Sequence, residues 1–480
     1  MQILFNIALL LFPIISFGQT RIENLLQEQA DTVYEKHGLD WHSAIRPQTR
    51  SKDTVYGFGN QKQVNPFKIG VTPMVDLAGT HRNNTFARIG LGVQTEMQYK
   101  KFFWRLGTVA GYGYGPNNAA LNTNAYFLQH SSSGTQYFYT DVRTRVAYTP
   151  NEVFQFQAGL DHHFFGEGVR SLWLSDYGIA NPFGQIKVNF WRVQYDIIYQ
   201  FMRENLQGER NNKFATTHHL SINILPWLNV GVFENVIYRP KTDGQRRGYE
   251  WEYLNPVIFL RPQEYAIGSS DNVLMGGSIT AKIKQHTIYS QLVIDEFNFA
   301  EIRADRSYWA NKLGIQLGVK GRFKTNQVHH FYRAEFNAIR PYTYSHIDTM
   351  HTYGHQGQPL AHPNGANFFE GILEYNIKYR RWNWGVFVRH LRKGYDMTEI
   401  SYGGDIYKPY TARPGDYGAY IGMGYLDNLT HIQLNANYEI LPKIKLNAYI
   451  QQHIQISSNN ISYWPVIGVR SRLWNDYRNY

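Results

Sequence analysis

The sequence predicts an all-β protein, a transmembrane outer-membrane β-barrel of about 18 (18–20) antiparallel strands with a short N-terminal periplasmic helix. The first observation is a period-two alternation of apolar and polar residues that recurs from Phe67 to the C-terminus. The second is that short turns and long loops alternate between these runs. The third is the composition. Aromatic residues make up 16% of the chain, and its mean hydropathy of −0.44 excludes a bundle of apolar spanning helices.

The N-terminus carries an export signal. Ile7–Ile15 is an apolar core too short to span a bilayer, and Ser16–Gly18 is a small-x-small cleavage site, so residues 1–18 are predicted to be a signal peptide. Residues 19–65 are expected to be periplasmic, with a helix over Arg21–Gly38 followed by a polar linker. We expect this segment to dock into or beneath the barrel, and contact with a periplasmic partner is the alternative. The chain contains no cysteine, so disulfides are excluded.

The barrel is expected over residues 66–480. The run Thr430–Leu441 shows the pattern most clearly, with Leu434 and Ala436 expected to face lipid and Asn437 to face the lumen. Nineteen runs can be counted, and the alternation of short and long connections fails after Lys393. A missed strand over Ile400–Lys408 would give 20 strands, and the number is 18 if two of the runs are parts of extracellular loops. An even number is expected. The runs begin near Phe67, Phe86, Phe102, Tyr137, Glu152, Phe183, Arg192, Phe214, Trp227, Asn272, His286, Asn311, Val328, Asn367, Trp382, Tyr417, Thr430, Lys443 and Ser462.

The net charge of +11 narrows the expected partners. Basic residues are dispersed over the predicted lumen-facing side of the strands, and no nucleic-acid-binding motif is present, so nucleic acid is not an expected partner. A basic lumen or rim is expected to attract acidic polysaccharide or the phosphates of lipopolysaccharide. The basic residues concerned are Arg88, Arg143, Arg145, Lys320, Arg389 and Lys445.

Two blocks of sequence resemble the capsule-assembly Wzi family. Gly166–Asp176 is similar to its Gly-x-Gly and Ser-Leu-x-Leu-Ser signature, and Asn255–Arg261 is similar to its Asn-Pro-x-x-Phe-x-Arg element. Three further segments, Trp41–Pro47, Arg340–His346 and Gln358–Phe368, resemble RemB-like gliding-motility proteins. The resemblance implies an outer-membrane barrel of 18 strands that handles surface polysaccharide. The family-motif residues are Gly166, Gly168, Ser171, Leu172, Ser175, Asn255, Pro256, Phe259 and Arg261.

Aromatic and basic residues in the long loops are the candidate glycan-binding site. Aromatic faces stack on sugar rings, and Arg pairs with the carboxylates of acidic glycans. Packing within the loop or contact with lipopolysaccharide explains the same residues without a specific glycan. The candidates are Arg246, Arg247, Tyr249 and Trp251 in the loop Arg239–Asp271, and Tyr342 and Tyr344 in the loop Pro341–Ala366.

The sequence favours a protein that is not an enzyme and has no cofactor. No Gly-x-Ser-x-Gly elbow and no cysteine nucleophile occur. His346, His351, His355 and His362 share one loop, but their spacing matches no compact metal motif, so no metal site is predicted.

The expected function is attachment or assembly of surface polysaccharide (capsule), or gliding motility. A porin-like diffusion channel is the alternative, and a hydrolase at the barrel rim is a weaker one. Expected partners are outer-membrane lipid and lipopolysaccharide, with surface polysaccharide and periplasmic or gliding-machinery proteins as further candidates.

Overall fold

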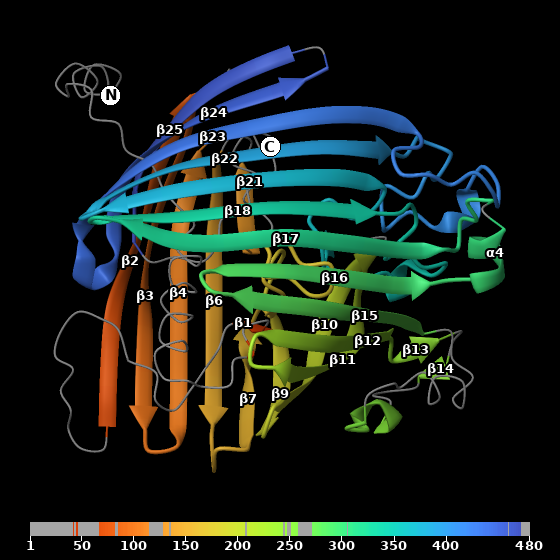
Figure 1. Ribbon diagram of the computed structural model, residues 1–480, viewed down its shortest axis with the longest axis horizontal. Helices are drawn as coiled ribbons and strands as arrows, with labels where there is room; N and C mark the ends of the chain where they lie inside the picture. Colours follow the sequence, from red (N-terminus) through yellow and green to blue (C-terminus); the bar gives the residue numbers. More distant parts are fainter. Residues whose placement is uncertain are drawn as a thin grey trace.

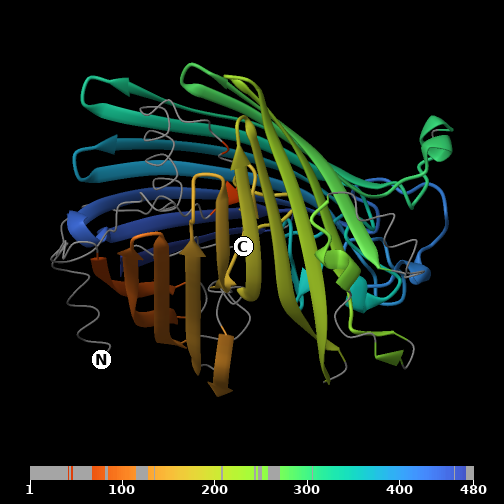
Figure 2. The ribbon, with the colours of Figure 1, turned by 90° about the horizontal axis from the view of Figure 1, so that it is seen from below.

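A computed structural model describes residues 42, 45–46, 67–81, 85–114, 128–133, 136–206, 209–242, 245–246, 251–257, 271–304, 306–458 and 460–471. The predicted signal peptide and the predicted helix Arg21–Gly38 lie outside these residues. Within them, 18 strands form one closed antiparallel barrel (Figures 1 and 2). No helix in this part of the chain is long and apolar enough to cross a membrane.

The barrel strands pair with their neighbours in chain order, and the last strand pairs with the first. They are β2 (Phe67–His81), β3 (Thr85–Tyr99), β4 (Phe102–Tyr114), β6 (Gln136–Tyr148), β7 (Phe154–Asp161), β9 (Asn181–Phe190), β10 (Val193–Leu206), β11 (Glu209–Leu225), β12 (Leu228–Tyr238), β15 (Asn272–Ile283), β16 (His286–Glu296), β17 (Lys312–Thr325), β18 (Val328–Ile339), β21 (Phe368–Tyr379), β22 (Trp382–Tyr395), β23 (Tyr425–Leu441), β24 (Leu446–Ser457) and β25 (Asn460–Arg470).

The predicted number of 18 strands is confirmed, and the alternative of 20 is wrong. The run that begins near Tyr417 and the candidate strand Ile400–Lys408 both lie in the loop between β22 and β23. Gly418, Gly422 and Gly424 adopt positive φ values there, which interrupts an extended strand. Deleting this one run restores the alternation of short turns and long loops along the chain.

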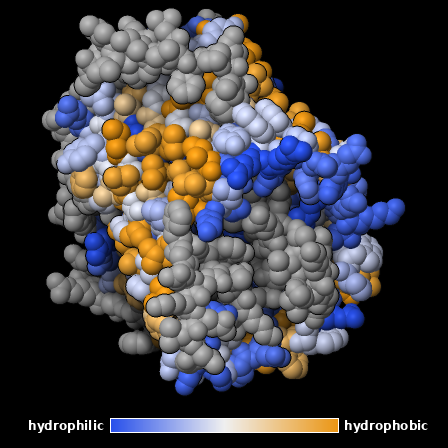
Figure 3. All heavy atoms as spheres, turned by 90° about the vertical axis from the view of Figure 1, so that its left-hand side faces the viewer, coloured by the Kyte–Doolittle hydropathy of each residue, from blue (hydrophilic) through white to orange (hydrophobic). Residues whose placement is uncertain are grey.

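The outer face of the barrel is apolar and the inner face is polar. Leu91 is 62% exposed, whereas Arg88 on the other face of the same strand is 1% exposed. On β23, Leu434 faces outward and Asn437 is buried, as predicted. Ala436 was also expected to face lipid, but its small side chain is buried between its cross-strand neighbours. Apolar side chains gather on the face shown in Figure 3, with hydrophilic ones beside them.

The two rims differ in their connections. Two-residue turns join β3 to β4, β17 to β18 and β21 to β22, and in these turns Lys100, Asn326 and Arg380 adopt positive φ values. The opposite rim carries the long loops and the short helix α4 (Phe299–Arg303), at the right of Figure 1. In outer-membrane barrels the short turns face the periplasm, so the long-loop rim faces the cell exterior.

Candidate functional site

A loop between β7 and β9 enters the lumen, and we call it the first plug loop (residues 162–180). It leaves one wall of the barrel and reaches the opposite wall at β16, β17 and β18. Glu167 pairs with Lys320 at 2.6 Å, the Val169 amide donates to Glu335 at 2.6 Å, and the Leu172 amide donates to Gln291 at 2.9 Å. Polar lumen-facing side chains therefore hold the backbone of this loop across the barrel.

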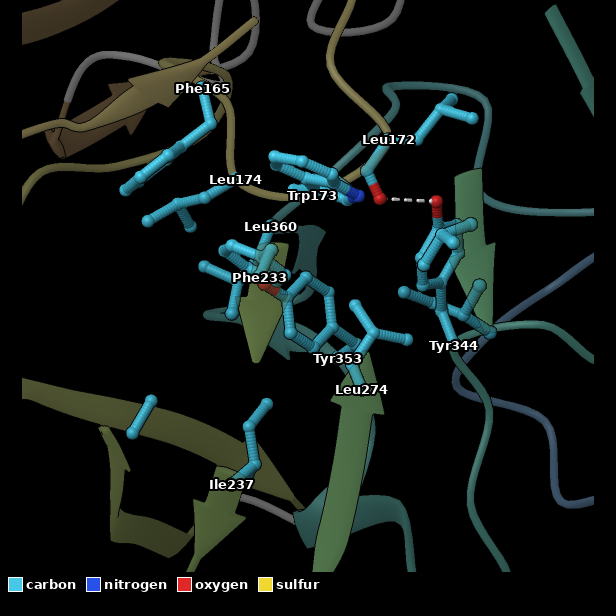
Figure 4. Packing of buried hydrophobic residues seen from close by; sticks show 14 of the residues in the cluster. Phe165, Leu172, Trp173, Leu174, Phe233, Ile237, Leu274, Tyr344, Tyr353 and Leu360 are labelled. Atoms are coloured by element: carbon cyan, nitrogen blue, oxygen red, sulfur yellow. Dashed lines mark hydrogen bonds between the residues drawn. The ribbon is translucent and has the colours of Figure 1, made fainter. Parts of the chain in front are cut away.

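The residues that resemble the Wzi signature build the first plug loop. Gly166 has a φ of +120°, and a Cβ on Gly168 would lie 2.5 Å from a carboxylate oxygen of Glu335, so both positions favour glycine. Leu172 is fully buried, and its carbonyl accepts a hydrogen bond from the Tyr344 hydroxyl at 2.8 Å (Figure 4). Ser175 donates through its hydroxyl to the Ala361 carbonyl at 2.6 Å. The motif thus has a structural role at these positions.

A second loop, between β18 and β21, packs against the first, and we call it the second plug loop (residues 340–367). The Ser175 amide donates to the Leu360 carbonyl at 2.8 Å, which joins the two loops. Around Trp173, which stacks on Phe233 with ring centroids 4.9 Å apart, apolar side chains from both loops and from the strands form the largest core cluster (Figure 4). Tyr353 belongs to it, so the lumen is filled here by packed side chains.

Glu370 on β21 connects both plug loops to the wall. Its carboxylate is 0% exposed and pairs with Arg170 of the first plug loop at 3.3 Å and with Arg389 of β22 at 2.6 Å. It also accepts from His362 of the second plug loop at 2.8 Å. A buried carboxylate that neutralises two arginines is costly to remove, so Glu370 is central to the plug.

Part of the N-terminal segment lies inside the barrel. β1 (Ile45–Arg46) pairs with β8 (Phe164–Phe165) at the start of the first plug loop. His42 contacts Ser221 of β11 through a hydrogen bond of 2.9 Å. At these positions the segment is docked in the lumen, as the sequence led us to expect.

The basic lumen expected from the sequence is largely neutralised. Each predicted lumen arginine or lysine on the strands lies beside a carboxylate: Arg88 with Asp76 (2.9 Å), Arg143 with Asp141 (3.0 Å), Arg145 with Asp161 (3.0 Å), Lys320 with Glu167 and Arg389 with Glu370. Lys445 lies in the turn between β23 and β24 instead of on a strand, and it too lies beside a carboxylate, that of Glu439 at 3.8 Å. Net attraction of an acidic glycan into the lumen is therefore weaker than the composition suggests.

The predicted glycan-binding residues do not form one exposed site. Tyr342 and Tyr344 are 1% and 0% exposed, and their hydroxyls donate to the carbonyls of Ser401 and Leu172. The structure therefore assigns both rings to packing instead of an exposed glycan surface. The sequence misled because an aromatic residue in a loop is not necessarily at the surface.

The loop between β12 and β15 is described only in part. Arg246 ends the two-residue strand β14 (Gln245–Arg246), which pairs with β13 (Lys241–Thr242), and Trp251 begins the 3₁₀ helix η1 (Trp251–Leu254). Pro256 accepts from the Tyr195 hydroxyl at 2.7 Å, and its neighbour Asn255 bonds locally to the Val257 amide. The other predicted positions, Arg247, Tyr249, Phe259 and Arg261, lie outside the described residues.

The histidines of the second plug loop stabilise its fold. Burial lowers the pKa of His362 to about 4, although Glu370 opposes this shift. For His351, burial also lowers the pKa, but its contacts with Asp271 (3.4 Å) and Asp348 (3.3 Å) outweigh burial and raise the pKa above its ordinary value. In the part of the chain that the structure describes, no three histidine, aspartate or glutamate side chains are grouped as a metal site.

An aromatic and basic cluster lies at the exterior rim, and we call it the rim cluster. It joins the loop between β16 and β17 to the loop between β22 and β23. Arg306 lies over the ring of Tyr417 at 4.5 Å, and Arg413 lies over the ring of Trp309 at 4.2 Å. The most accessible rings are Tyr417, 51% exposed, and Tyr420, 62% exposed. Its members are Arg306, Tyr308, Trp309, Tyr410, Arg413, Tyr417 and Tyr420.

The arginines of the rim cluster are paired with acids. Arg306 binds Glu301 at 2.6 Å, and Arg413 binds Asp416 at 2.7 Å. Stacking on the exposed rings is therefore the main interaction that the cluster offers to a ligand. The sequence carried a signal for this cluster, since aromatic residues and arginines are frequent in both loops, but the run near Tyr417 was interpreted as a strand.

A closed barrel with an apolar outer face, a polar lumen and rims of unequal loop length is an outer-membrane β-barrel protein. No family model and no curated protein matches the sequence. Among solved structures the chain is similar to Wzi of Escherichia coli, described as involved in group 1 capsule assembly and as a carbohydrate-binding β-barrel. The two chains are 12% identical with a TM-score of 0.57, and the match covers 96% of this chain and 99% of that one.

Two further solved structures align with lower TM-scores. OprD of Pseudomonas aeruginosa is 8% identical with a TM-score of 0.43, over 88% of this chain and 98% of that one. The opdK outer-membrane protein of Pseudomonas aeruginosa is 8% identical with a TM-score of 0.45, over 85% and 98% of the two chains. The likeness to Wzi is a likeness of fold, and the resemblance to RemB stays a prediction from the sequence.

Proposed function

We propose that this protein is a non-enzymatic outer-membrane barrel that binds surface polysaccharide at its exterior rim. The observation that carries the proposal is the rim cluster, where the exposed ring of Tyr417 is held by a cation–π contact with Arg306 and the ring of Trp309 beside it by one with Arg413. Rings fixed in place lose little conformational freedom when a sugar stacks on them. The carbohydrate binding stated for the structurally similar Wzi barrel supports the same choice.

The plug argues against the alternative of a diffusion channel. A channel needs a continuous polar path, whereas Leu172, Trp173 and Tyr344 pack tightly inside this barrel. A lack of conductance in planar bilayers would support the binding role, and a large steady conductance of the wild type would favour the channel.

We expect removal of the exposed rings to weaken polysaccharide binding. Replacing Tyr417 and Tyr420 together by Ala should reduce the affinity for the purified surface polysaccharide by about tenfold or more, because each stacked ring contributes on the order of 1 kcal/mol. Added salt should have little effect, because the arginines nearby are already paired. Binding is measured by calorimetry on the detergent-solubilised protein.

The control is Tyr99→Ala, which removes a 40% exposed tyrosine at the opposite rim. A second variant, in which Arg246, Arg247, Tyr249 and Trp251 are all replaced, tests the site predicted from the sequence. Full affinity in the Tyr417/Tyr420 variant would contradict the rim cluster as the binding site. Loss of binding only in the second variant would move the site to the loop 239–271.

The cellular role is proposed to be capsule attachment or assembly, or gliding motility. A strain that lacks the protein should release surface polysaccharide or lose surface movement, without becoming permeable to small solutes, because a plugged barrel contributes little to permeability. Retained polysaccharide and spreading are measured together with uptake of a small dye. Normal retention and normal spreading in the deletion strain would contradict this role.

A further inference from the structure

The turns at the periplasmic rim carry an excess of positive charge. The connections that join strands at this rim all lie within the described residues: 100–101, 149–153, 191–192, 226–227, 284–285, 326–327, 380–381 and 442–445. Together they contain one carboxylate, that of Glu152, and eight basic side chains, so their net charge is +7. We call the basic side chains the basic ring: Lys100, Lys101, Arg192, Lys284, Arg380, Arg381, Lys443 and Lys445.

The charge of the basic ring is open to solvent and is scarcely neutralised. Every member except Lys445 is exposed. Among the described residues, Lys445 is also the one member within ion-pair distance of a carboxylate, that of Glu439 at 3.8 Å. Lys101 and Arg192 donate to backbone carbonyls, which carry no formal charge. Residues 19–66 contain six basic and six acidic side chains, so their sequence does not change the balance. The ring can therefore attract an external anion.

Three members of the basic ring lie over the aromatic ring of the preceding residue. Cation–π contacts of this kind hold an exposed cation in place without neutralising its charge. The three side chains are thus positioned beside rings and still carry a full positive charge. The pairs are Lys100 with Tyr99 (5.3 Å to the ring centre), Arg192 with Trp191 (5.3 Å) and Arg380 with Tyr379 (5.2 Å).

These aromatic rings show how deep the cations lie in the membrane. Tyr99 is 40% exposed on the lipid-facing side of β3, the side that also carries Leu91. Tyr379 lies on the same side of β21 as Leu373, which is 58% exposed. In outer-membrane barrels such rings mark the boundary between the hydrocarbon and the headgroups. A cation in the adjoining turn therefore lies at the depth of the lipid phosphates in the periplasmic leaflet.

The basic ring is spread around the barrel instead of forming a patch on one side. Its members occupy the turns between β3 and β4, β9 and β10, β15 and β16, β21 and β22, and β23 and β24. Because the strands of the closed barrel follow chain order, these turns are distributed around its circumference. A protein that docks on one side would contact a continuous patch, whereas a lipid leaflet meets the wall on every side. The distribution therefore favours lipid as the partner.

We infer that the basic ring binds anionic phospholipids of the periplasmic leaflet, with phosphatidylglycerol as the representative headgroup. Lysine and arginine donate charge-assisted hydrogen bonds to phosphate oxygens. An anionic membrane surface also attracts basic side chains that lie within a screening length of it. The apolar outer face of the strands continues directly from the turns and contacts the acyl chains of the same lipids.

This inference goes beyond polysaccharide binding and concerns the opposite rim. A failure of glycan binding at the rim cluster would leave the basic ring unaffected. Absence of a lipid preference would likewise leave the rim cluster unaffected, because the two sites share no residue.

The test measures the preference of the protein for an anionic lipid. The protein is reconstituted into phosphatidylcholine vesicles, and electron paramagnetic resonance compares the association of spin-labelled phosphatidylglycerol with that of spin-labelled phosphatidylcholine. We expect the wild type to favour phosphatidylglycerol by about fivefold. Raising the ionic strength to about 1 M should reduce this preference, because the screening length falls from about 10 Å to about 3 Å.

Two triple variants remove the same charge from the periplasmic rim. The ring variant replaces the three cations that lie over aromatic rings: Lys100→Gln/Arg192→Gln/Arg380→Gln. The control variant replaces three cations near the same rim that lie on the lumen-facing side of their strands: Lys282→Gln/Lys324→Gln/Lys378→Gln. Each of these lies two or four residues along its strand from a buried lumen residue, namely Thr280, Lys320 and Glu374.

The ring variant should lose most of the preference for phosphatidylglycerol, and the control variant should keep it. Heat-modifiable migration checks that both variants are folded. If the ring variant does not fold, Arg381→Gln/Lys443→Gln takes its place, with Lys324→Gln/Lys378→Gln as the control. No preference in the wild type, an unchanged preference in the ring variant, or an equal loss in ring and control variants would overturn the inference.

Discussion

Deletion of residues 463–480 is expected to abolish the closed barrel. The deletion removes most of β25, which pairs with β24 from Asn447 to Ser457 and with β2 from Asp76 to Thr80. Both neighbours would then present unpaired backbone groups to lipid, and each such group costs several kcal/mol. The truncated chain should lose the fast migration of the folded barrel on unboiled gels and become sensitive to protease.

A shorter deletion of residues 472–480 is the control, because it leaves β25 intact. It separates the effect of the pairing strand from that of the aromatic residues Trp474, Tyr477 and Tyr480 that follow it in the sequence. Heat-modifiable migration of the 463–480 deletion like that of the full-length protein would contradict the expectation.

The seam between β25 and β2 explains why this deletion should be so damaging. The ladder there covers only five residues of β2, Asp76–Thr80. Asp76 is 1% exposed and lies 2.9 Å from Arg88 on β3 and 3.7 Å from Arg470 on β25. A buried carboxylate between two arginines thus reinforces this short ladder, and the deletion removes one of its partners, Arg470.

The strands could be predicted from the sequence because their signal is local. Each run shows the alternation with period two within its own residues. A two-residue turn such as Lys100–Lys101 can likewise be recognised without reference to the rest of the chain. The one strand predicted in error, near Tyr417, shows the limit. An aromatic loop with regularly spaced residues carries the same alternation, and only the pairing of β22 with β23 excludes it.

The plug could not be predicted, because its contacts join residues that are far apart in the chain. Lys320 on β17 and Glu167 in the first plug loop are 153 residues apart, and each alone looks like an ordinary lumen or loop charge. The ion pairs that neutralise the lumen could not be predicted for the same reason, since they also depend on which residues the fold brings together. Composition records the excess of lysine and arginine, but it does not record which carboxylate lies opposite each one.

The candidate site could therefore be predicted only in part from the sequence. The motif Gly166–Ser175 was noticed through a family resemblance, but its role in holding the plug follows from the lumen residues around it. Tyr344 was noticed for its aromatic ring, yet its ring and hydroxyl are buried in the plug. The rim cluster depends on two loops separated by about a hundred residues, which only the closed barrel brings together.

Replacing Glu370 by Ala is expected to open the plug. The substitution leaves Arg170 and Arg389 buried without this shared carboxylate, and a broken buried ion pair costs about 3–5 kcal/mol. His362 loses its acceptor at the same time. Both plug loops thus lose their shared anchor on β21, whereas the backbone ladder between β21 and β22 remains. We expect a folded barrel with new channel openings in planar bilayers and with plug loops that protease can cleave.

Glu374→Ala is the matched control for this variant. Glu374 lies on the same strand and the same lumen-facing side, but its ion-pair partner is Arg333 on the neighbouring strand β18 instead of a plug-loop residue. It should change stability without opening a conducting path. If Glu370→Ala folds normally and its conductance and protease resistance equal those of the wild type, Glu370 does not hold the plug. The position of the two loops would then be set by the apolar packing around Trp173 and Tyr353.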